Sequence, residues 1–285
     1  MRKLSALAVL GLAGAFLLSG CAAELDPVEA RDSLTEVTED PEPPATASEY
    51  DAKLHPEPVV EPQECSHYLV ITARGTGEPS KGQLLSPVAK DISKARPGEV
   101  TTEDLDYPAD TNVKEGGTRG VRVLIDTLNV QAEACPDQEF VLLGYSQGAM
   151  VIGDTLAAAD TRMIGETTGA LNADAAAHVL AVVMYGDPRF EGKESFNVGS
   201  FDPELGGIMP RQLGSLDPYA DRISDFCVEG DLVCQASLAA GESRDAVDSA
   251  QEQHVAYYTN GMQKEGAEFV IDKLGPKAKK TTPTR

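Results

Sequence analysis

Basic residues are scarce in this sequence: 24 lysines and arginines stand against 46 aspartates and glutamates, which gives a formal net charge of −22. An excess of negative charge this large repels the phosphates of nucleic acids and the headgroups of anionic lipids. We therefore expect no nucleic-acid partner and no electrostatic adsorption to a membrane. Internal repeats and metal-ligand clusters are lacking as well, so neither a repeat protein nor a metal or organic cofactor is expected.

A hydrophobic run long enough to cross a membrane is also lacking. The apolar stretch at residues 4–18 has 15 residues, fewer than the ~20 that a membrane-spanning helix needs. Arg2 and Lys3 precede this stretch and small residues follow it, which is the pattern of an export signal. Because of this pattern, we expect residues 1–20 to be a signal peptide that is not part of the fold.

The stretch ends in Leu-Ser-Gly-Cys21, which resembles a bacterial lipoprotein box. In such a box Cys21 receives a diacylglycerol and becomes the new N-terminus; the alternative is an ordinary cleaved signal with a coincidental cysteine. Residues 21–64 contain seven prolines and 13 acidic residues, a composition that predicts a disordered tether. Residues 276–285 are predicted to be a disordered basic tail. The protein would then be exported and lipid-anchored to the outer face of the cell membrane or envelope, or released from it.

Cysteines are few, and their number is informative. Five are present, and lipidation of Cys21 leaves four in an oxidising setting, where an even number favours two disulfides. Four cysteines allow three pairings. Cys227 and Cys234 are close in sequence and flank a short loop, which favours their pairing and leaves Cys65 to pair with Cys135.

Between residues 65 and 275, short apolar runs alternate with longer segments of helical periodicity. Unbroken apolar strands that alternate with helices are typical of a parallel sheet covered by helices on both faces. We therefore expect one three-layer α/β domain with a parallel sheet of about five strands. The expected strands are 68–73, 100–105, 140–143, 179–185 and 222–226, and the expected helices are 82–94, 119–134, 147–158 and 257–274.

The segment Gly144-Tyr-Ser146-Gln-Gly148 fits the pattern G-x-S-x-G. The pattern alone is weak, but here an apolar strand precedes it and a helical segment follows it. This is the setting of a nucleophile elbow, in which a strained serine projects its hydroxyl over the carboxyl edge of the sheet. Gly144 and Gly148 leave room for the tight turn. The alternative is a serine in an ordinary strand–helix loop.

A serine hydroxyl needs a base to take its proton, and only four histidines are available. His55 lies in the expected tether. His67 and His178 stand at or before the starts of strands, which places them at the wrong edge of a parallel sheet, because sites form at the carboxyl ends. His254 remains, in a loop before the last helix, and it completes the chain order Ser…Asp…His of this fold type.

Two aspartates are candidates to orient His254. Asp187 directly follows the strand at 179–185 and lies at the correct edge. Asp231 lies between Cys227 and Cys234, where a small disulfide ring would hold a carboxylate in place at little further entropic cost. We favour Asp231 and expect Asp187, with the proline after it, to fix the turn that leaves its strand.

An oxyanion hole requires two donors aimed at the tetrahedral oxygen. The backbone N–H of Gln147, directly after the nucleophile, is one expected donor. The other is expected from Thr76 in the glycine-rich loop 73–78, which follows the first strand. A plain turn is the alternative for this loop; it is not a phosphate loop, because it lacks the Gly-Lys-Ser/Thr ending.

Together the segments ITARGTGEP, DYPAD, LLGYSQGAMV, FCVEGDLVC and HVAYYTNG resemble the cutinase family from Cys65 to about Leu274. The resemblance implies a compact, lidless α/β hydrolase with two disulfides. It also implies that Ser146, Asp231 and His254 form a catalytic triad, with Thr76 and Gln147 in the oxyanion hole. Fungal members of the family commonly have serine at the position of Thr76, so the hydroxyl is kept and a methyl group is added to the acyl slot.

The function that follows from this resemblance is hydrolysis of an acyl ester or lipid by a serine esterase, with a monomer as the default. An acyltransferase of cell-envelope lipids is the alternative, because water and an alcohol can deacylate the serine with the same residues. A non-catalytic adhesin or structural lipoprotein on a hydrolase fold is a third reading. The presence of Ser146, Asp231 and His254 speaks against it.

Overall fold

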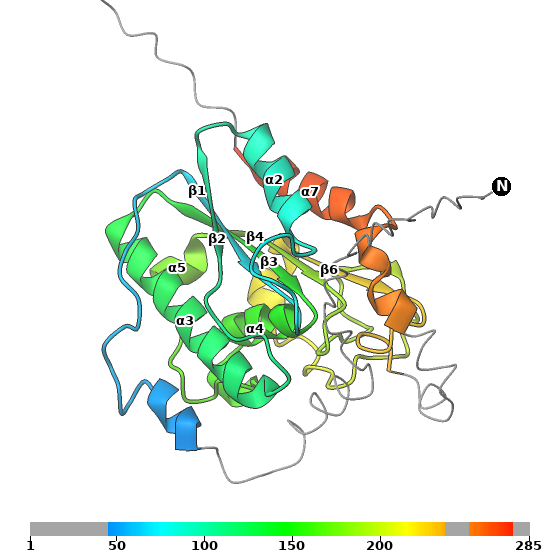
Figure 1. Cartoon of the computed structure of the whole chain (residues 1–285), viewed down its shortest axis with the longest axis horizontal. Helices are drawn as coiled ribbons and strands as arrows, with labels where there is room; N and C mark the ends of the chain where they lie inside the picture. The colour runs from blue at the N-terminus through cyan, green and yellow to red at the C-terminus, as the bar shows by residue number, and fades with distance from the viewer. Residues whose placement is uncertain (1–44, 237–250, 276–285) are drawn as a thin grey trace, which may run out of the picture.

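The computed structural model describes residues 45–236 and 251–275; the expected signal peptide, Cys21 and the basic tail lie outside this part. Six parallel strands form one sheet in the order β2-β1-β3-β4-β6-β5 (Figure 1). The expected parallel α/β fold is therefore confirmed. The strands are β1 (Tyr68–Ala73), β2 (Val100–Asp104), β3 (Glu139–Tyr145), β4 (Val179–Tyr185), β5 (Asn197–Ser200) and β6 (Ile223–Val228).

Helices cover both faces of the sheet. Alternate residues of each strand point to opposite sides, and because both sets are apolar, both faces must be buried. Leu69 and Ile71 of β1 pack in one core with apolar residues of α3, α4 and α5, whereas Tyr68 and Val70 pack in a second core with α2 and α7. The sheet is thus the middle of three layers. The helices are α2 (Ser86–Ala95), α3 (Val113–Ala134), α4 (Gln147–Leu156), α5 (Ala173–Ala177) and α7 (Met262–Lys273), with 3₁₀ turns η1 (Ala45–Tyr50), η2 (Ala159–Thr161), η3 (Asp217–Arg222) and η5 (Ala256–Tyr258).

The strand order changes direction between β1 and β3. After β1 the chain passes through α2 to β2 on one side, and it then crosses back through α3 to add β3 on the other side. The loops that leave β1 and β3 therefore turn toward opposite faces of the sheet. Such a reversal opens a crevice at the carboxyl ends of the two strands, where α/β proteins bind their ligands.

Helix α3 begins at Val113, six residues before the expected start. Asn112 caps it: the side-chain oxygen accepts from the Glu115 backbone N–H at 3.4 Å, and its amide donates to the Glu115 carboxylate at 2.8 Å. The first of these bonds satisfies the Glu115 N–H, which the first turn leaves without a partner, and the second fixes the side chain that caps it. Strand β5 was not expected at all, since it is a short, partly exposed edge strand without an apolar run.

Residues 48–64 differ from the expected disordered tether, because they lie along α3. The guanidinium of Arg122 donates to the carbonyl oxygens of His55 at 3.0 Å and Glu57 at 2.8 Å. Its Nε donates to Asp126 at 2.7 Å, and Asp126 also accepts from the Val59 N–H at 2.9 Å. An extended proline-rich segment leaves its carbonyl groups unpaired, so a buried arginine can satisfy them. The domain therefore includes part of the segment assigned to the tether.

The two disulfides join Cys65 to Cys135 and Cys227 to Cys234, which confirms the favoured pairing. The first ties the approach to β1 to the C-terminal end of α3. The second closes a ring of eight residues that begins at the end of β6. Within the described ranges, no helix has both the length and the apolar character required to span a membrane.

The contacts of Arg122 predict that its substitution lowers the free energy of unfolding and leaves the carboxyl edge of the sheet unchanged. The Arg122→Leu variant leaves Asp126 buried without its partner, which costs about 3–5 kcal/mol and should lower Tm by roughly 10 °C. The control is Arg119→Leu on the same helix, which removes a solvent-exposed pair with Asp106 and should cost less than about 1 kcal/mol. Equal melting temperatures of the two variants, measured by calorimetry, would contradict this account.

Candidate active site

Ser146 stands in the turn between β3 and α4, at the carboxyl end of β3 where the strand order changes direction. Its backbone has φ 53° and ψ −121°. Among the described residues, Ala109 is the only other non-glycine residue with a positive φ. Such a conformation is strained for a residue with a Cβ, and strained residues of this kind cluster at functional sites. The hydroxyl-bearing side chain therefore projects from a sharp strand–turn–helix junction, as the elbow pattern predicts.

The glycines on either side make this turn possible. A Cβ on Gly144 would lie 2.7 Å from the Cα of Ala149, and a Cβ on Gly148 would lie 1.9 Å from the carbonyl oxygen of Ala73. Both distances are shorter than real contacts allow. The two glycines let α4 pack against the strand before it and let the elbow approach the end of β1.

His254 connects Ser146 to Asp231. Its Nε2 lies 3.0 Å from the Ser146 Oγ, and its Nδ1 lies 2.9 and 3.0 Å from the two Asp231 carboxylate oxygens. Ser146 and His254 are each 6 % exposed and Asp231 is 0 % exposed. With Nδ1–H donating to the carboxylate, Nε2 is free to accept the serine proton, so the arrangement can activate a nucleophile.

Two buried tyrosines contact this set of residues, and sequence reasoning did not single them out. The ring of Tyr145 stacks on the His254 imidazole with centroids 5.1 Å apart, and its hydroxyl donates to the His254 carbonyl oxygen at 2.9 Å. The Tyr257 hydroxyl donates to Asp231 at 2.7 Å. Burial and the negative charge of Asp231 raise the pKa of both phenols well above their usual range, so both remain donors.

The glycine-rich loop after β1 lies against the elbow, where the second oxyanion donor was expected. A Cβ on Gly75 would lie 3.3 Å from the Ser146 Cβ, and the Thr76 hydroxyl donates to the Gln147 side-chain oxygen at 3.2 Å. The Glu78 carboxylate accepts from the Gly75 N–H at 2.7 Å and braces the loop. Within the described part of the chain, the backbone N–H groups of Thr76 and Gln147 have no protein acceptor.

Asp187, the other candidate carboxylate, has different partners. It accepts from the Arg189 N–H at 2.9 Å and lies 2.8 Å from an Arg211 nitrogen. These contacts fix the turn after β4, which is the role expected of it. The neighbouring Asp225 is also buried, and burial followed by the charge of Asp187 raises its pKa well above the usual range.

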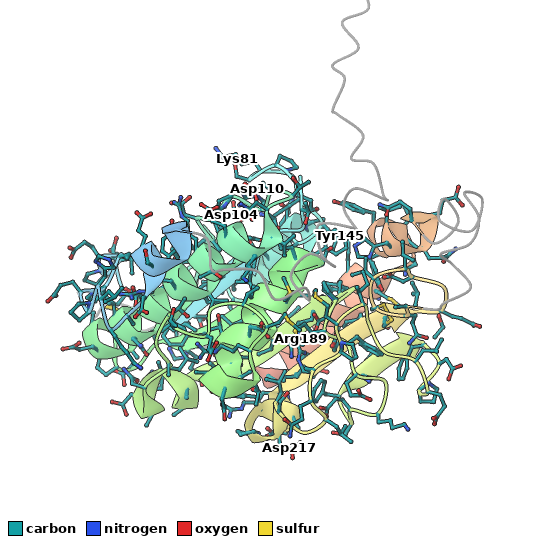
Figure 2. The ribbon with its side chains drawn as sticks, turned by 90° about the horizontal axis from the view of Figure 1, so that it is seen from below. Lys81, Asp104, Asp110, Tyr145, Arg189 and Asp217 are labelled. Carbon is teal, nitrogen blue, oxygen red and sulfur yellow. A yellow bond between two sulfur atoms is a disulfide. The ribbon has the colours of Figure 1, made fainter. Side chains whose placement is uncertain are left out.

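The site lies at one end of the molecule. Figure 2 shows Tyr145, next to Ser146, at the same end as Lys81 and Asp110, which follow β1 and β2, whereas Asp217 lies at the opposite end. His67 and His178 precede β1 and β4 and thus lie at the amino edge, as expected.

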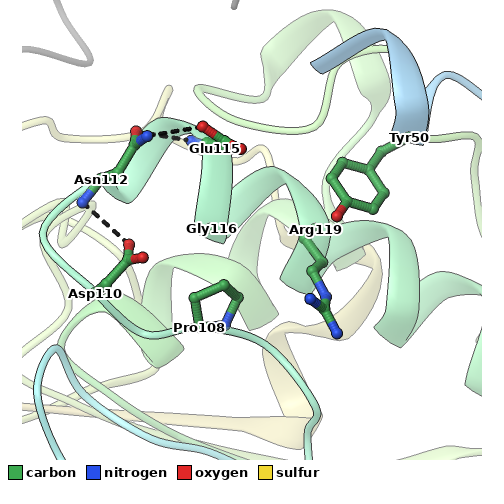
Figure 3. A pocket seen from close by; sticks show the side chains of 7 residues that line it. All are labelled: Tyr50, Pro108, Asp110, Asn112, Glu115, Gly116 and Arg119. Carbon is green, nitrogen blue, oxygen red and sulfur yellow. Dashed lines mark hydrogen bonds between the residues drawn. The ribbon is translucent and has the colours of Figure 1, made fainter. Parts of the chain in front are cut away.

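A separate pocket lies between η1 and the first turns of α3 (Figure 3). Most of its polar groups are paired: the Asn112 backbone N–H donates to the Asp110 carboxylate at 3.0 Å, the Asn112 side-chain amide donates to the Glu115 carboxylate at 2.8 Å, and Arg119 pairs with Asp106 at 3.0 Å. None of the residues that line it belongs to the serine site. We therefore assign no chemistry to this pocket, because most of its polar groups already bond one another or Asp106.

The chain is similar in sequence and in fold to cutinases and acetylxylan esterases. The family model described as Cutinase matches residues 64–274. A cutinase of Kineococcus radiotolerans is 30 % identical over 223 residues, which cover 77 % of this chain and 65 % of that protein. Acetylxylan esterase 2 of Talaromyces purpureogenus is 30 % identical over 189 residues, 62 % of this chain and 79 % of that one. The solved catalytic core of acetyl xylan esterase from Trichoderma reesei is 26 % identical with a TM-score of 0.61 and covers 74 % of this chain and 100 % of its own.

The different partners of the two aspartates predict different effects on the reactivity of Ser146. Asp231→Asn should slow labelling of Ser146 by a fluorophosphonate by roughly 10³–10⁴-fold, because an amide favours the wrong imidazole tautomer. Asp187→Asn, the matched control, should slow labelling far less and mainly lower Tm. If Asp187→Asn slowed the labelling more than Asp231→Asn did, the assignment of the carboxylate would be wrong.

Proposed function

Because this chain belongs to the cutinase family of carboxylic ester hydrolases, we propose that it hydrolyses acyl esters through Ser146, His254 and Asp231. The observation that carries this proposal is the position of His254, with Nε2 at 3.0 Å from a serine hydroxyl and Nδ1 at 2.9 Å from a buried carboxylate. An ordinary surface histidine bonds water, whereas His254 is buried and bonds a hydroxyl and a carboxylate at the same time. The same serine also has the strained backbone of a nucleophile elbow.

The proposed reaction has two halves. The Ser146 Oγ attacks the ester carbonyl carbon while His254 Nε2 takes the hydroxyl proton, and Asp231 stabilises the imidazolium that forms. The tetrahedral intermediate collapses, and the alcohol leaves with the proton from His254. Water then attacks the acyl-enzyme, gives its proton to His254, and the carboxylic acid leaves as Ser146 recovers its proton.

The negative charge that develops on the carbonyl oxygen needs donors that are already in place. We assign this role to the backbone N–H groups of Thr76 and Gln147. Their lack of protein acceptors within the described chain supports the assignment, as does the contact of the Thr76 hydroxyl with the Gln147 side chain, which joins the two sides of the hole. Val255, next to His254 in the chain, and Tyr258, whose ring lies edge-on to Tyr145 at 6.3 Å, are 42 % and 43 % exposed and offer apolar surface to an acyl group.

The nucleophile is tested most simply by removing its hydroxyl. Ser146→Ala should lower kcat for p-nitrophenyl butyrate by on the order of 10⁴–10⁶ and leave Tm within a few degrees. Ser66→Ala, at the amino edge of the sheet, is the control and should keep wild-type rates. Activity of Ser146→Ala within tenfold of wild type would refute the proposal.

The same assay separates hydrolysis from acyl transfer. With the wild-type enzyme and added glycerol, butyric acid should remain the main product because water is the expected acceptor. A predominance of butyrylglycerol would favour the acyltransferase alternative instead, with the same serine as nucleophile.

The proposed location is the outer face of the cell membrane or envelope, with the chain anchored through a lipid on Cys21. The two disulfides support an oxidising compartment, and the Leu-Ser-Gly-Cys21 sequence supports the anchor. In bacterial cells that export the protein, Cys21→Ser should move the enzyme from the membrane fraction to the medium. Equal membrane association of wild type and variant would contradict the anchor.

A further inference from the structure

The buried hydroxyl of Tyr257 is placed where it can control the geometry of Asp231. Tyr257 is 0 % exposed and lies in η5, three residues after His254. Its hydroxyl donates to Asp231 Oδ2 at 2.7 Å, accepts from the Val228 N–H at 3.3 Å, and lies 3.4 Å from the Cys234 Sγ. The Tyr257 hydroxyl therefore contacts the small disulfide ring at three places: near its first end at Val228, at its last residue Cys234, and at the carboxylate of Asp231.

These contacts matter because Asp231 and His254 come from different segments. Asp231 belongs to the ring closed by Cys227 and Cys234, whereas His254 and Tyr257 share the short segment before α7. Residues 237–250, which connect the two segments, lie outside the described part of the chain. Besides the His254–Asp231 contact itself, the Tyr257 hydroxyl is the direct polar link between the described ring and the histidine segment.

The donors around Asp231 show what the hydroxyl adds. Oδ1 accepts from the Val233 N–H at 2.8 Å and lies 2.9 Å from His254 Nδ1, while Oδ2 accepts from Tyr257 and lies 3.0 Å from the same Nδ1. Each oxygen thus has one further donor, which holds the carboxylate plane with both oxygens near Nδ1. Asp231 is 0 % exposed, so water cannot readily replace the phenol.

We propose that Tyr257 is a positioning residue of the esterase site, whose hydroxyl holds the Asp231 carboxylate in line with His254 and shares its negative charge. The inference rests on the proposed Ser-His-Asp mechanism. Tyr257 is 0 % exposed and donates to Asp231, so it acts through this carboxylate. Its effect is therefore on the chemical step rather than on substrate binding.

A variant without the hydroxyl tests this role. Tyr257→Phe should lower kcat for p-nitrophenyl butyrate by about 10- to 100-fold, because small misplacements of catalytic groups have effects of this size, and should change KM less than twofold. The acid limb of the kcat/KM profile should move to higher pH, because a carboxylate that no longer shares its charge with a phenol holds the imidazolium proton more tightly.

The matched control is Tyr68→Phe. Tyr68 is another buried tyrosine, 1 % exposed, whose hydroxyl accepts from the Gly275 N–H at 3.1 Å near the amino edge of the sheet. Its variant should lower Tm but keep kcat within twofold and leave the pH profile unchanged. A Tyr257→Phe enzyme that behaves in the same way, with a lower Tm and wild-type kcat and pH profile, would overturn the proposal.

A double-mutant cycle tests whether Tyr257 acts through Asp231. In an Asp231→Asn background, adding Tyr257→Phe should change the rate of fluorophosphonate labelling of Ser146 less than twofold, because the carboxylate to be positioned is absent. A further loss of tenfold or more would mean that the tyrosine acts independently of Asp231. Labelling is measured instead of turnover because it detects slow variants.

A second substitution covers the case in which Tyr257→Phe does not fold. Replacing Tyr257 with 3,5-difluorotyrosine nearly preserves the size of the side chain and makes its hydroxyl a stronger donor, so the acid limb should move to lower pH. An unchanged profile would contradict the proposal. If Ser146→Ala remained active, the esterase mechanism itself would fail; an inactive Ser146→Ala beside a fully active Tyr257→Phe would refute only the role of Tyr257.

Discussion

The imidazole of His254 bonds the hydroxyl of Ser146 and the carboxylate of Asp231, which come from distant parts of the chain. The fold brings these three groups together. A parallel sheet delivers the loops after β3 and β6 to one edge, where Ser146 and Asp231 stand. Burial strengthens the electrostatic contacts at this edge, but it also requires partners for every charge. Asp231 therefore takes donors from Val233, Tyr257 and His254 in place of water.

Much of this arrangement was accessible from the sequence, because it depends on local chemistry. The strand at 179–185 was predicted at its observed bounds, since a buried parallel strand is an unbroken apolar run. Gly144 and Gly148 marked the elbow because no other residue fits beside Ala73 and Ala149. The short spacing of Cys227 and Cys234 indicated their disulfide and, through it, a rigid place for Asp231.

What sequence reasoning missed depends on partners far away in the chain. Residues 48–64 have the composition of a disordered tether, and they are held because Arg122, some 65 residues later, bonds their carbonyl groups. Tyr145 occupies a variable position of the elbow motif and Tyr257 the start of an expected helix, and only the fold shows that their hydroxyls face His254 and Asp231. Polar contacts of this kind leave no periodic signal in a sequence.

The proposed reaction cleaves an ester through an acyl group carried on Ser146. The direct measurement is rapid mixing of the wild-type enzyme with excess p-nitrophenyl butyrate, an acid quench within the first turnovers, and peptide mapping by mass spectrometry. We expect one butyryl group on the peptide that contains Ser146, and this group should disappear as the substrate is exhausted. Turnover with no acyl group on this peptide, or with the acyl group on another residue, would contradict the proposed reaction.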